Sequence, residues 1–281
     1  MLVVVAIGSV QTGSAIARTL FDDLGVPGTA LLRLVIASLI LLTALRPDVR
    51  SWSRQAWLAA ALLGAAMAGM NLVFYLSLRT VPLGIAVTVE FLGPLLLALA
   101  QTRRLNDLLW ALLAAAGVML LGLDTTSGFA TTGLLLAFVA GLFWAGYILA
   151  SAHVGQLLPG VSGLAVALAV SSILVFPFGA QGAAQVFSQP SLLIGAAAVA
   201  VLSSVVPYGL ELTALRRLPT RVFGVLMSLQ PAAAAIAGRL VLGQQLGVRE
   251  LVALVMVSFA SVGITLGGAT SMLLSRSMPD P

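Results

Sequence analysis

Long apolar runs, separated by short polar connections, make up most of this chain. Ten of the runs have about the 20 residues that an α-helix needs to cross about 30 Å of hydrocarbon. We predict membrane-spanning helices at residues 1–21, 28–45, 55–78, 82–101, 106–123, 131–151, 161–179, 191–214, 219–241 and 249–270. The pattern therefore predicts an all-α membrane protein with ten transmembrane helices and no soluble domain.

A proline spacing recurs in the fourth and ninth predicted helices. The segments PLGIAVTVEFLGP (Pro82 to Pro94) and PTRVFGVLMSLQP (Pro219 to Pro231) each hold two prolines twelve residues apart, and the second segment lies 137 residues after the first. Halves of five helices each must have opposite orientations in the membrane, because five is an odd number. Inverted repeats with broken helices at matching positions are typical of secondary transporters.

We therefore predict two inverted five-helix repeats around a central cavity. The first repeat is expected at residues 1–124 and the second at residues 131–270, followed by a short cytoplasmic tail at 271–281. The first helix lacks a basic leader segment, so we expect it to be a retained span and not a signal peptide.

Composition supports a membrane protein and excludes several other classes. The chain is 60% hydrophobic and 8% charged, with a mean hydropathy of +1.12, so lipid must be its solvent. All 14 basic residues are arginines; they lie mainly at the ends of the predicted helices and form no stripe, so we expect no nucleic-acid partner. The chain has no cysteine and only one histidine, His153, and we predict neither a metal site nor a cofactor.

The arginines also predict the orientation in the membrane. With the N-terminus inside, nine arginines lie in cytoplasmic connections and the tail, and four lie at helix ends on the opposite side. Since cytoplasmic loops carry the excess of basic residues, we expect both termini in the cytoplasm. Arg33, about two turns inside the second predicted helix, counts for neither side.

Glu90 is the first candidate for a functional residue. It lies near the middle of its predicted helix, where a charge costs at least ~2.5–3.5 kcal/mol on insertion scales. Pro94 lacks the N–H that would have bonded the carbonyl of Glu90, so that carbonyl is freed four residues before the proline. A substrate ammonium group or a proton would suit this site. The alternative is a protonated, structural glutamate bonded to a neighbouring helix.

Other prolines predict further helix breaks. Pro231 frees the carbonyl of Met227, and Pro207 frees the carbonyl of Ser203. An isolated membrane proline is more often a structural kink than part of a ligand site, and both interpretations remain open here. The predicted helix-break residues are Pro82, Pro94, Pro207, Pro219 and Pro231.

Polar and aromatic residues near the middle of other helices are candidates for the cavity wall. Asn71 and Tyr75 are four residues apart and share a helix face, and Trp144 and Tyr147 are three apart. Trp144 lies deep in its span, so we expect it to line the cavity, the alternative being a membrane-interface anchor. The predicted substrate-binding residues are Glu90, Asn71, Tyr75, Trp144, Tyr147, Tyr208, Gln11 and Ser14.

Two further features were interpreted structurally. Glu211 lies within a turn of its helix end, near Arg216 and Arg217, and we expect an ion pair there or a side chain that reaches to the membrane surface, the alternative being a substrate role. Gly263 and Gly267, four residues apart, predict either a dimer face or close packing inside one bundle, so we expect a monomer or a weak homodimer.

We predict no enzymatic activity and no catalytic residues. The sequence contains no glycine-rich phosphate loop and no H-E-x-x-H motif. His153 is not placed to activate a serine in the membrane.

Two long strings resemble a known family. GMNLVFYLSLRTVPLGIAVTVEFLGP (Gly69 to Pro94) and VPYGLELTALRRLPTRVFGVLMSLQP (Val206 to Pro231) resemble the threonine/homoserine exporters of the EamA group, in the drug/metabolite transporter superfamily. The resemblance covers nearly the whole chain. It implies ten helices in two inverted halves, a central cavity, and export of amino acids across the bacterial inner membrane. Small multidrug-type relatives use a glutamate in the first helix as proton carrier, and this chain has none there, which argues against that coupling scheme.

We therefore predict an exporter of small polar amino acids such as threonine and homoserine, with broad specificity and alternating access. Glu90 would bind the substrate ammonium, and Asn71, Tyr75 and Tyr208 would bind the carboxylate. The alternatives are an aromatic amino acid exporter of the same superfamily, and a channel-like facilitator or receptor without alternating access.

Overall fold

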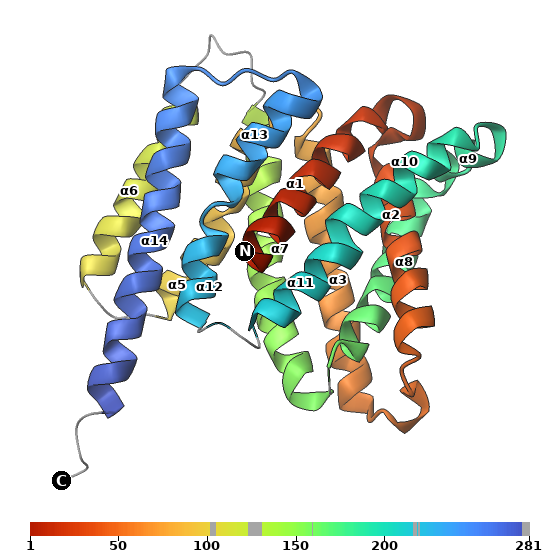
Figure 1. Ribbon diagram of the computed structural model, residues 1–281, viewed down its shortest axis with the longest axis horizontal. Helices are drawn as coiled ribbons and strands as arrows, with labels where there is room; N and C mark the ends of the chain where they lie inside the picture. The colour runs from red at the N-terminus through yellow and green to blue at the C-terminus, as the bar shows by residue number, and fades with distance from the viewer. Residues whose placement is uncertain (102–104, 123–130, 159, 216–217, 219, 277–281) are drawn as a thin grey trace.

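The computed structural model describes residues 1–101, 105–122, 131–158, 160–215, 218 and 220–276 (Figure 1). All regular elements within these residues are helical. They are α1 (Leu2–Thr19), α2 (Phe21–Leu45), α3 (Arg54–Ser77), α4 (Leu83–Glu90), α5 (Leu92–Ala100), α6 (Leu105–Gly122), α7 (Thr131–Leu157), α8 (Ser162–Ala183), α9 (Gln185–Ser188), α10 (Ser191–Ala200), α11 (Val206–Leu215), α12 (Thr220–Met227), α13 (Gln230–Leu242) and α14 (Val248–Arg276). A 3-10 helix, η1 (Val49–Ser51), precedes α3, and a π-helix, η2 (Val201–Val205), joins α10 to α11.

Nine helical segments of the described residues are long and apolar enough to cross a membrane. Each overlaps one of the ten predicted spans. The remaining prediction, at 106–123, falls on α6, whose described apolar part (Leu108–Leu121) is shorter than the others. The prediction of an all-helical, multi-pass membrane protein is therefore confirmed, with nine of its ten spans matched.

The second helix begins earlier than its apolar pattern predicts. Sequence reasoning placed its start at residue 28, whereas α2 runs from Phe21 and is kinked at Gly25 (φ 65°, ψ 163°). Glycine reaches this positive φ without the clash that a Cβ would cause. Thr29 Oγ1 donates a hydrogen bond to the carbonyl of Gly25 at 2.9 Å, which ties the two parts of the kink together.

Two spans are divided near the middle. α4 ends at Glu90 and α5 begins at Leu92, while α12 ends at Met227 and α13 begins at Gln230. The first residues after these ends, Phe91 and Ser228, are 137 positions apart, which is the offset of the proline repeat.

Each predicted break proline that the structure describes lies at the start of a helical segment. Pro82 immediately precedes α4, Pro94 lies in the first turn of α5, Pro207 is the second residue of α11, and Pro231 is the second residue of α13. At Pro82, Pro94 and Pro231 the missing N–H costs little, because the first-turn N–H groups of a helix have no intrahelical acceptor, whereas α11 continues directly from η2. Pro219 lies outside the described residues.

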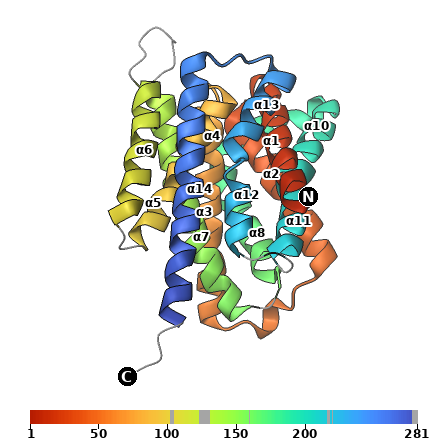
Figure 2. The same ribbon diagram turned by 60° about the vertical axis from the view of Figure 1, so that its left-hand side comes forward.

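The main packing contacts join the first half of the chain to the second. α2 packs on α8, α3 on α7 and α8, α6 on α14, α1 on α11 and α13, and α4 on α7 and α13. In Figure 1, α6 and α14 form one side of the molecule, and α2 and α8 lie on the opposite side. Figure 2 shows the same bundle turned by 60°. The two halves interleave, so residues far apart in sequence meet in the centre.

Glycines allow close backbone contact at two of these interfaces. A Cβ on Gly141 of α7 would collide with the carbonyl oxygen of Glu90, and one on Gly93 of α5 would collide with Gly141. Gly263 of α14 lies against the indole of Trp110 in α6. Gly263 therefore serves packing within one bundle, the second of the two interpretations of its spacing.

Candidate functional site

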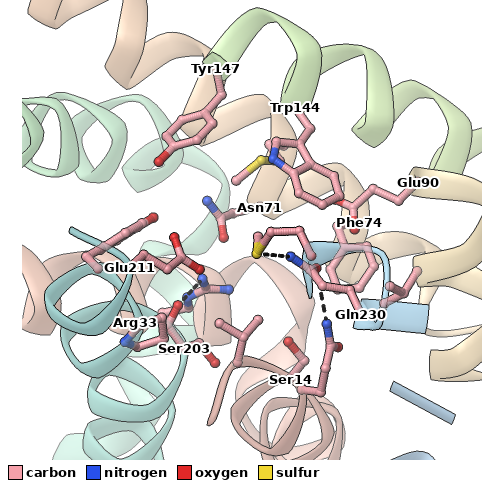
Figure 3. Close-up of a pocket in the computed structure, with 17 residues that line it drawn as sticks. Ser14, Arg33, Asn71, Phe74, Glu90, Trp144, Tyr147, Ser203, Glu211 and Gln230 are labelled. Atoms are coloured by element: carbon pink, nitrogen blue, oxygen red, sulfur yellow. Dashed lines mark hydrogen bonds between the residues drawn. The ribbon is translucent and has the colours of Figure 1, made fainter. Parts of the chain in front are cut away.

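A cavity with many polar side chains on its wall, called the polar cavity below although apolar atoms make up most of that wall, lies between the helices of the two halves (Figure 3). Its volume is about 120 Å³, and its wall comes from α1, α2, α3, α4, α7, η2, α11, α12 and α13. Both divided spans contribute a residue beside their break: Glu90, and the pair Met227 and Gln230. The cavity is therefore built where the sequence interrupts its helices.

Seven of the eight predicted substrate-binding residues lie on this wall. They are Glu90, Asn71, Trp144, Tyr147, Tyr208, Gln11 and Ser14. They come from five different helical spans, so no local pattern could have shown that they meet. Val10, Met70, Phe74 and Val87 supply apolar surface between them.

The structure places the eighth residue, Tyr75, behind the wall and not in it. Its side chain is fully buried, and its ring packs against Phe21 with centroids 5.5 Å apart. Its hydroxyl accepts a hydrogen bond from Nη1 of Arg33 at 3.0 Å. Tyr75 thus contacts Arg33 and Phe21 of α2 and does not reach the cavity wall, where we expected it to contact a ligand.

Arg33 lies on the cavity wall and is held by three hydrogen bonds. Besides the bond to Tyr75, its Nε donates to Ser204 Oγ at 3.1 Å, and its Nη2 donates to the carbonyl oxygen of Ser203 at 2.9 Å. Its guanidinium carbon lies 5.5 Å from the centroid of the Tyr75 ring, within the range of a cation–π contact. The side chain is only 6% exposed. Arg33 is therefore a buried cation in a fixed orientation.

The π-helix explains how Ser203 can accept this bond. Pro207 has no N–H, so the carbonyl four residues before it has no helical donor, and the widened turn of Val201–Val205 presents that carbonyl to α2. Ser203 Oγ is buried on the cavity wall and has no hydrogen-bond partner among the described residues. The carbonyl that the sequence analysis identified as free is thus taken by Arg33.

The opposite side of the cavity is acidic. Figure 3 shows Glu90 and Trp144 on one side, and Arg33 and Ser203 on the other. Glu90 lines the cavity, and no salt bridge joins it to Arg33. The carbonyl of Glu90 faces the backbone of Gly141, so the freed carbonyl packs against α7 while the carboxylate is left to the cavity.

Trp144 covers this acidic side. Its indole meets the ring of Phe91 edge-on, with centroids 5.4 Å apart and an interplanar angle of 74°. Phe91 is the residue at which α4 gives way to α5. The aromatic pair therefore connects the helix break to α7, next to Glu90.

Side-chain contacts of two glutamines link α1, α13 and α12 at the cavity wall. Gln11 Nε2 on α1 donates to Gln230 Oε1 on α13 at 3.5 Å, and Gln230 Nε2 lies 3.8 Å from the sulfur of Met227 (Figure 3). Gln11 Oε1 is buried and has no partner among the described residues. One acceptor on this side is thus available to a ligand.

Glu211 lies on the cavity wall, although its position near a helix end suggested a peripheral role. It is also part of the walls of two neighbouring cavities. The expected partners, Arg216 and Arg217, lie outside the described residues. Glu211 is therefore a second carboxylate at the junction of three spaces.

The largest of these neighbouring cavities has a volume of about 410 Å³ and a mostly apolar wall. It shares Trp144, Tyr147, Glu211 and Met227 with the polar cavity and extends between α5, α7, α12 and α14. The part of the chain that the structure describes contains no group of three His, Asp or Glu side chains placed to hold a metal ion.

Sequence reasoning missed Arg33 and Glu211, for different reasons. The signal for Arg33 was present: an ionisable residue inside a span is a functional candidate by the argument applied to Glu90. Glu211 gave a weaker signal, because a carboxylate close to a helix end can reach the membrane surface from any face. Only the packing of α11 against α1 directs it inwards.

Comparisons with known proteins agree with this arrangement. Residues 131–266 match the EamA-like transporter family. The threonine/homoserine exporter RhtA of Salmonella typhimurium is 41% identical over 269 residues, which cover 95% of this chain and 90% of that protein. The protein of the same name from Escherichia coli K12 is 40% identical over the same share. A solved structure, described only as the crystal structure of a protein, covers 95% of this chain and 98% of its own with a TM-score of 0.61 at 18% identity, which shows a common fold.

Proposed function

The chain belongs to the EamA-like transporter family, and from this premise we propose that it exports small polar amino acids of the threonine and homoserine type. The observation that carries the proposal is the central cavity: a small polar space within the membrane, with carboxylates and a cation on its wall. A free amino acid is a zwitterion and needs charged partners of both signs. Relatives that share 40–41% of the sequence are named threonine/homoserine exporters.

Glu90 is the proposed partner of the substrate ammonium group. Its carboxylate forms no hydrogen bond with the described residues, so its oxygens are available to a ligand. Gln11 Oε1 offers a further acceptor nearby on α1. Ser14, Asn71 and Tyr208 supply polar groups for the side-chain hydroxyl of the substrate.

The size of the cavity favours small substrates. A volume of about 120 Å³ is well below the ~300–1,000 Å³ typical of sites for drug-sized ligands. An aromatic amino acid, the alternative substrate class, would have to extend past Trp144 into the apolar cavity of about 410 Å³. We therefore place threonine and homoserine first and aromatic amino acids second.

Transport by alternating access between two inverted repeats is part of the proposal, and helix packing supports it. Exchanging each helix with its counterpart 137 residues away maps the contacts of one half onto those of the other. The contact of α3 with α7 then corresponds to that of α11 with α1, and the contact of α1 with α13 to that of α7 with α4 and α5. Two pairs of counterpart helices pack directly on each other, α2 with α8 and α6 with α14, and the divided spans that correspond to each other meet where α4 packs on α13. On this proposal α6 also crosses the membrane, as the fifth span in chain order, and brings the total to ten. The repeats are residues 1–124 and 131–270.

Counterflow in proteoliposomes tests the function. Vesicles loaded with unlabelled threonine should transiently accumulate labelled threonine and homoserine above equilibrium, because a carrier exchanges substrate through one alternating site. Simple equilibration without an overshoot would mean a channel-like facilitator. An overshoot with labelled phenylalanine or tryptophan, but not with threonine or homoserine, would mean an aromatic amino acid exporter.

The proposed location is the bacterial inner membrane, with both termini in the cytoplasm. The chain has no cysteine, so a single introduced one can be labelled without background. Ser51 in η1, between the first two proposed cytoplasmic arginines and α3, is exposed. A Ser51→Cys variant should be labelled by a membrane-impermeant maleimide only after the cells are opened. Labelling in intact cells would reverse the proposed orientation.

A further inference from the structure

We propose that Arg33 is the carboxylate anchor of the transport site, so that the protein selects ligands with a free carboxylate. This inference rests on the proposed function and adds a residue and a ligand requirement to it. The sequence analysis gave the carboxylate to Asn71, Tyr75 and Tyr208, all of them neutral. The structure offers a cation instead.

Arg33 has hydrogen-bond donors that no described residue uses. A guanidinium carries five N–H donors. Three are used, in the bonds to Ser204, Tyr75 and Ser203. Among the described residues no carboxylate forms a salt bridge with Arg33, so two N–H groups, one on each terminal nitrogen, have no protein acceptor. A planar guanidinium presents such groups in a fork that matches a carboxylate.

Arg33 is also a buried positive charge. Taking a cation out of water is expensive unless an anion or several acceptors compensate for it. Three neutral acceptors hold Arg33, but none of them is an anion. The same wall holds Glu90 and Glu211, but neither forms a salt bridge with Arg33, so a ligand carboxylate in the cavity would supply the anion in direct contact with the guanidinium.

A second polar group, the hydroxyl of Ser203, lies close to Arg33. Ser203 Oγ is buried on the cavity wall without a partner, next to the carbonyl that accepts from Arg33. Its Oγ packs against Gly13 of α1, and its O–H group has no acceptor among the described residues. A purely structural arginine would not need an unsatisfied hydroxyl beside it.

The position of the guanidinium is fixed from outside the cavity. Tyr75 and Ser204 contact Arg33 but are not part of the cavity wall, so they act as positioning residues. Such support reduces the ordering that a ligand has to bring about when it binds. With the carboxylate at Arg33, the ammonium group points across the cavity towards Glu90, which lies on the opposite side in Figure 3.

The test compares threonine with threoninol, in which a hydroxymethyl group replaces the carboxylate and the ammonium and side chain are kept. Affinities are measured as ligand-dependent thermal stabilisation of the purified full-length protein, which reports folding at the same time. The wild type should bind threonine at least about 30-fold more tightly than threoninol, as expected for a buried charge-assisted pair.

The Arg33→Gln variant should lose about 30-fold in threonine affinity and keep its threoninol affinity within about 3-fold. Arg33→Lys, which keeps the charge but loses the fork, should lie between the two. Arg79→Gln removes an exposed arginine outside the cavity and should change neither affinity.

The following results would contradict the proposal. Equal affinities of the wild type for both ligands, an unchanged threonine affinity in Arg33→Gln, or an equal loss for both ligands would show that Arg33 does not bind the carboxylate. If neither Arg33 variant folds, Tyr75→Phe must show the same selective loss for threonine, and a nonselective loss overturns the anchor. A wild type without threonine or homoserine counterflow would instead refute the proposed function, and the anchor with it.

Discussion

The two sides of the central cavity are built in different ways. On the basic side, Arg33 is held by three hydrogen bonds that it donates to Tyr75, Ser203 and Ser204. On the acidic side, the carboxylate of Glu90 has no hydrogen bond from the described residues, and its position depends on a helix break and on backbone contact with Gly141. One charge is therefore fixed by side chains and the other by packing.

The largest effect on affinity is expected from Glu90→Gln, which keeps the size of the side chain and removes its charge. If Glu90 binds the substrate ammonium, threonine affinity should fall by about 30-fold or more, because an ion pair inside the cavity is lost. Threonine counterflow and ligand-dependent thermal stabilisation measure this. Asp23→Asn, which removes an exposed carboxylate on α2, is the control. Wild-type affinity in Glu90→Gln would leave Glu90 with a structural role and shift attention to Glu211.

The second effect concerns the packing that holds the acidic side. A methyl group at Gly141 would meet the carbonyl of Glu90 and the backbone of Gly93, so Gly141→Ala should destabilise the protein by about 1–3 kcal/mol. Thermal unfolding of the purified protein in detergent measures the change. Gly146→Ala, on the same helix but with only Ala66 at the edge of contact, should be nearly neutral. Equal stability of the two variants would contradict the close contact of α5 with α7.

The third effect concerns the support of the basic side. Ser204→Ala removes the acceptor of the Nε bond of Arg33, and Ser204 itself does not line the cavity. The loss of one hydrogen bond of about 1 kcal/mol should weaken threonine binding by about 5-fold and leave threoninol binding unchanged. Ser172→Ala, a buried serine that bonds within α8, serves as the matched control. A similar effect of both serine variants would indicate general destabilisation.

The smallest effect is a change in size selectivity. Trp144 separates the polar cavity from the larger apolar one and packs edge-on against Phe91. Trp144→Phe should raise the affinity for phenylalanine by about 3-fold, since the wall between the cavities is opened, and change threonine affinity less. Competition against labelled threonine counterflow gives both values, with Trp57→Phe at the exposed start of α3 as control. A loss of affinity for both amino acids would mean that Trp144 contacts the small substrate directly.

Much of the fold was predictable because the bilayer restricts it. Lipid cannot hydrogen-bond a backbone, so long apolar runs have to be helices, and nine of the ten predicted spans were confirmed. The boundary of α2 was missed because a glycine at positive φ continues the helix through a kink that the apolar pattern treats as its start. The site residues were predictable one at a time, since polar groups are costly in lipid, and seven of the eight predicted residues line one cavity.

The sequence by itself determined nine segments that are able to cross a membrane, the breaks beside Pro94 and Pro231, and that Glu90 lies inside a span. It also identified the carbonyl of Ser203 as free, because a proline four residues later removes a donor whatever surrounds it. Only the tertiary structure determined which donor bonds to that carbonyl. Arg33, Tyr75 and Ser203 lie on α2, α3 and η2, and the packing of these separate elements turns an isolated intramembrane arginine into an oriented cation. Hydrogen bonds depend on distance and angle, and those are set by how helices pack, which no single run of the sequence contains.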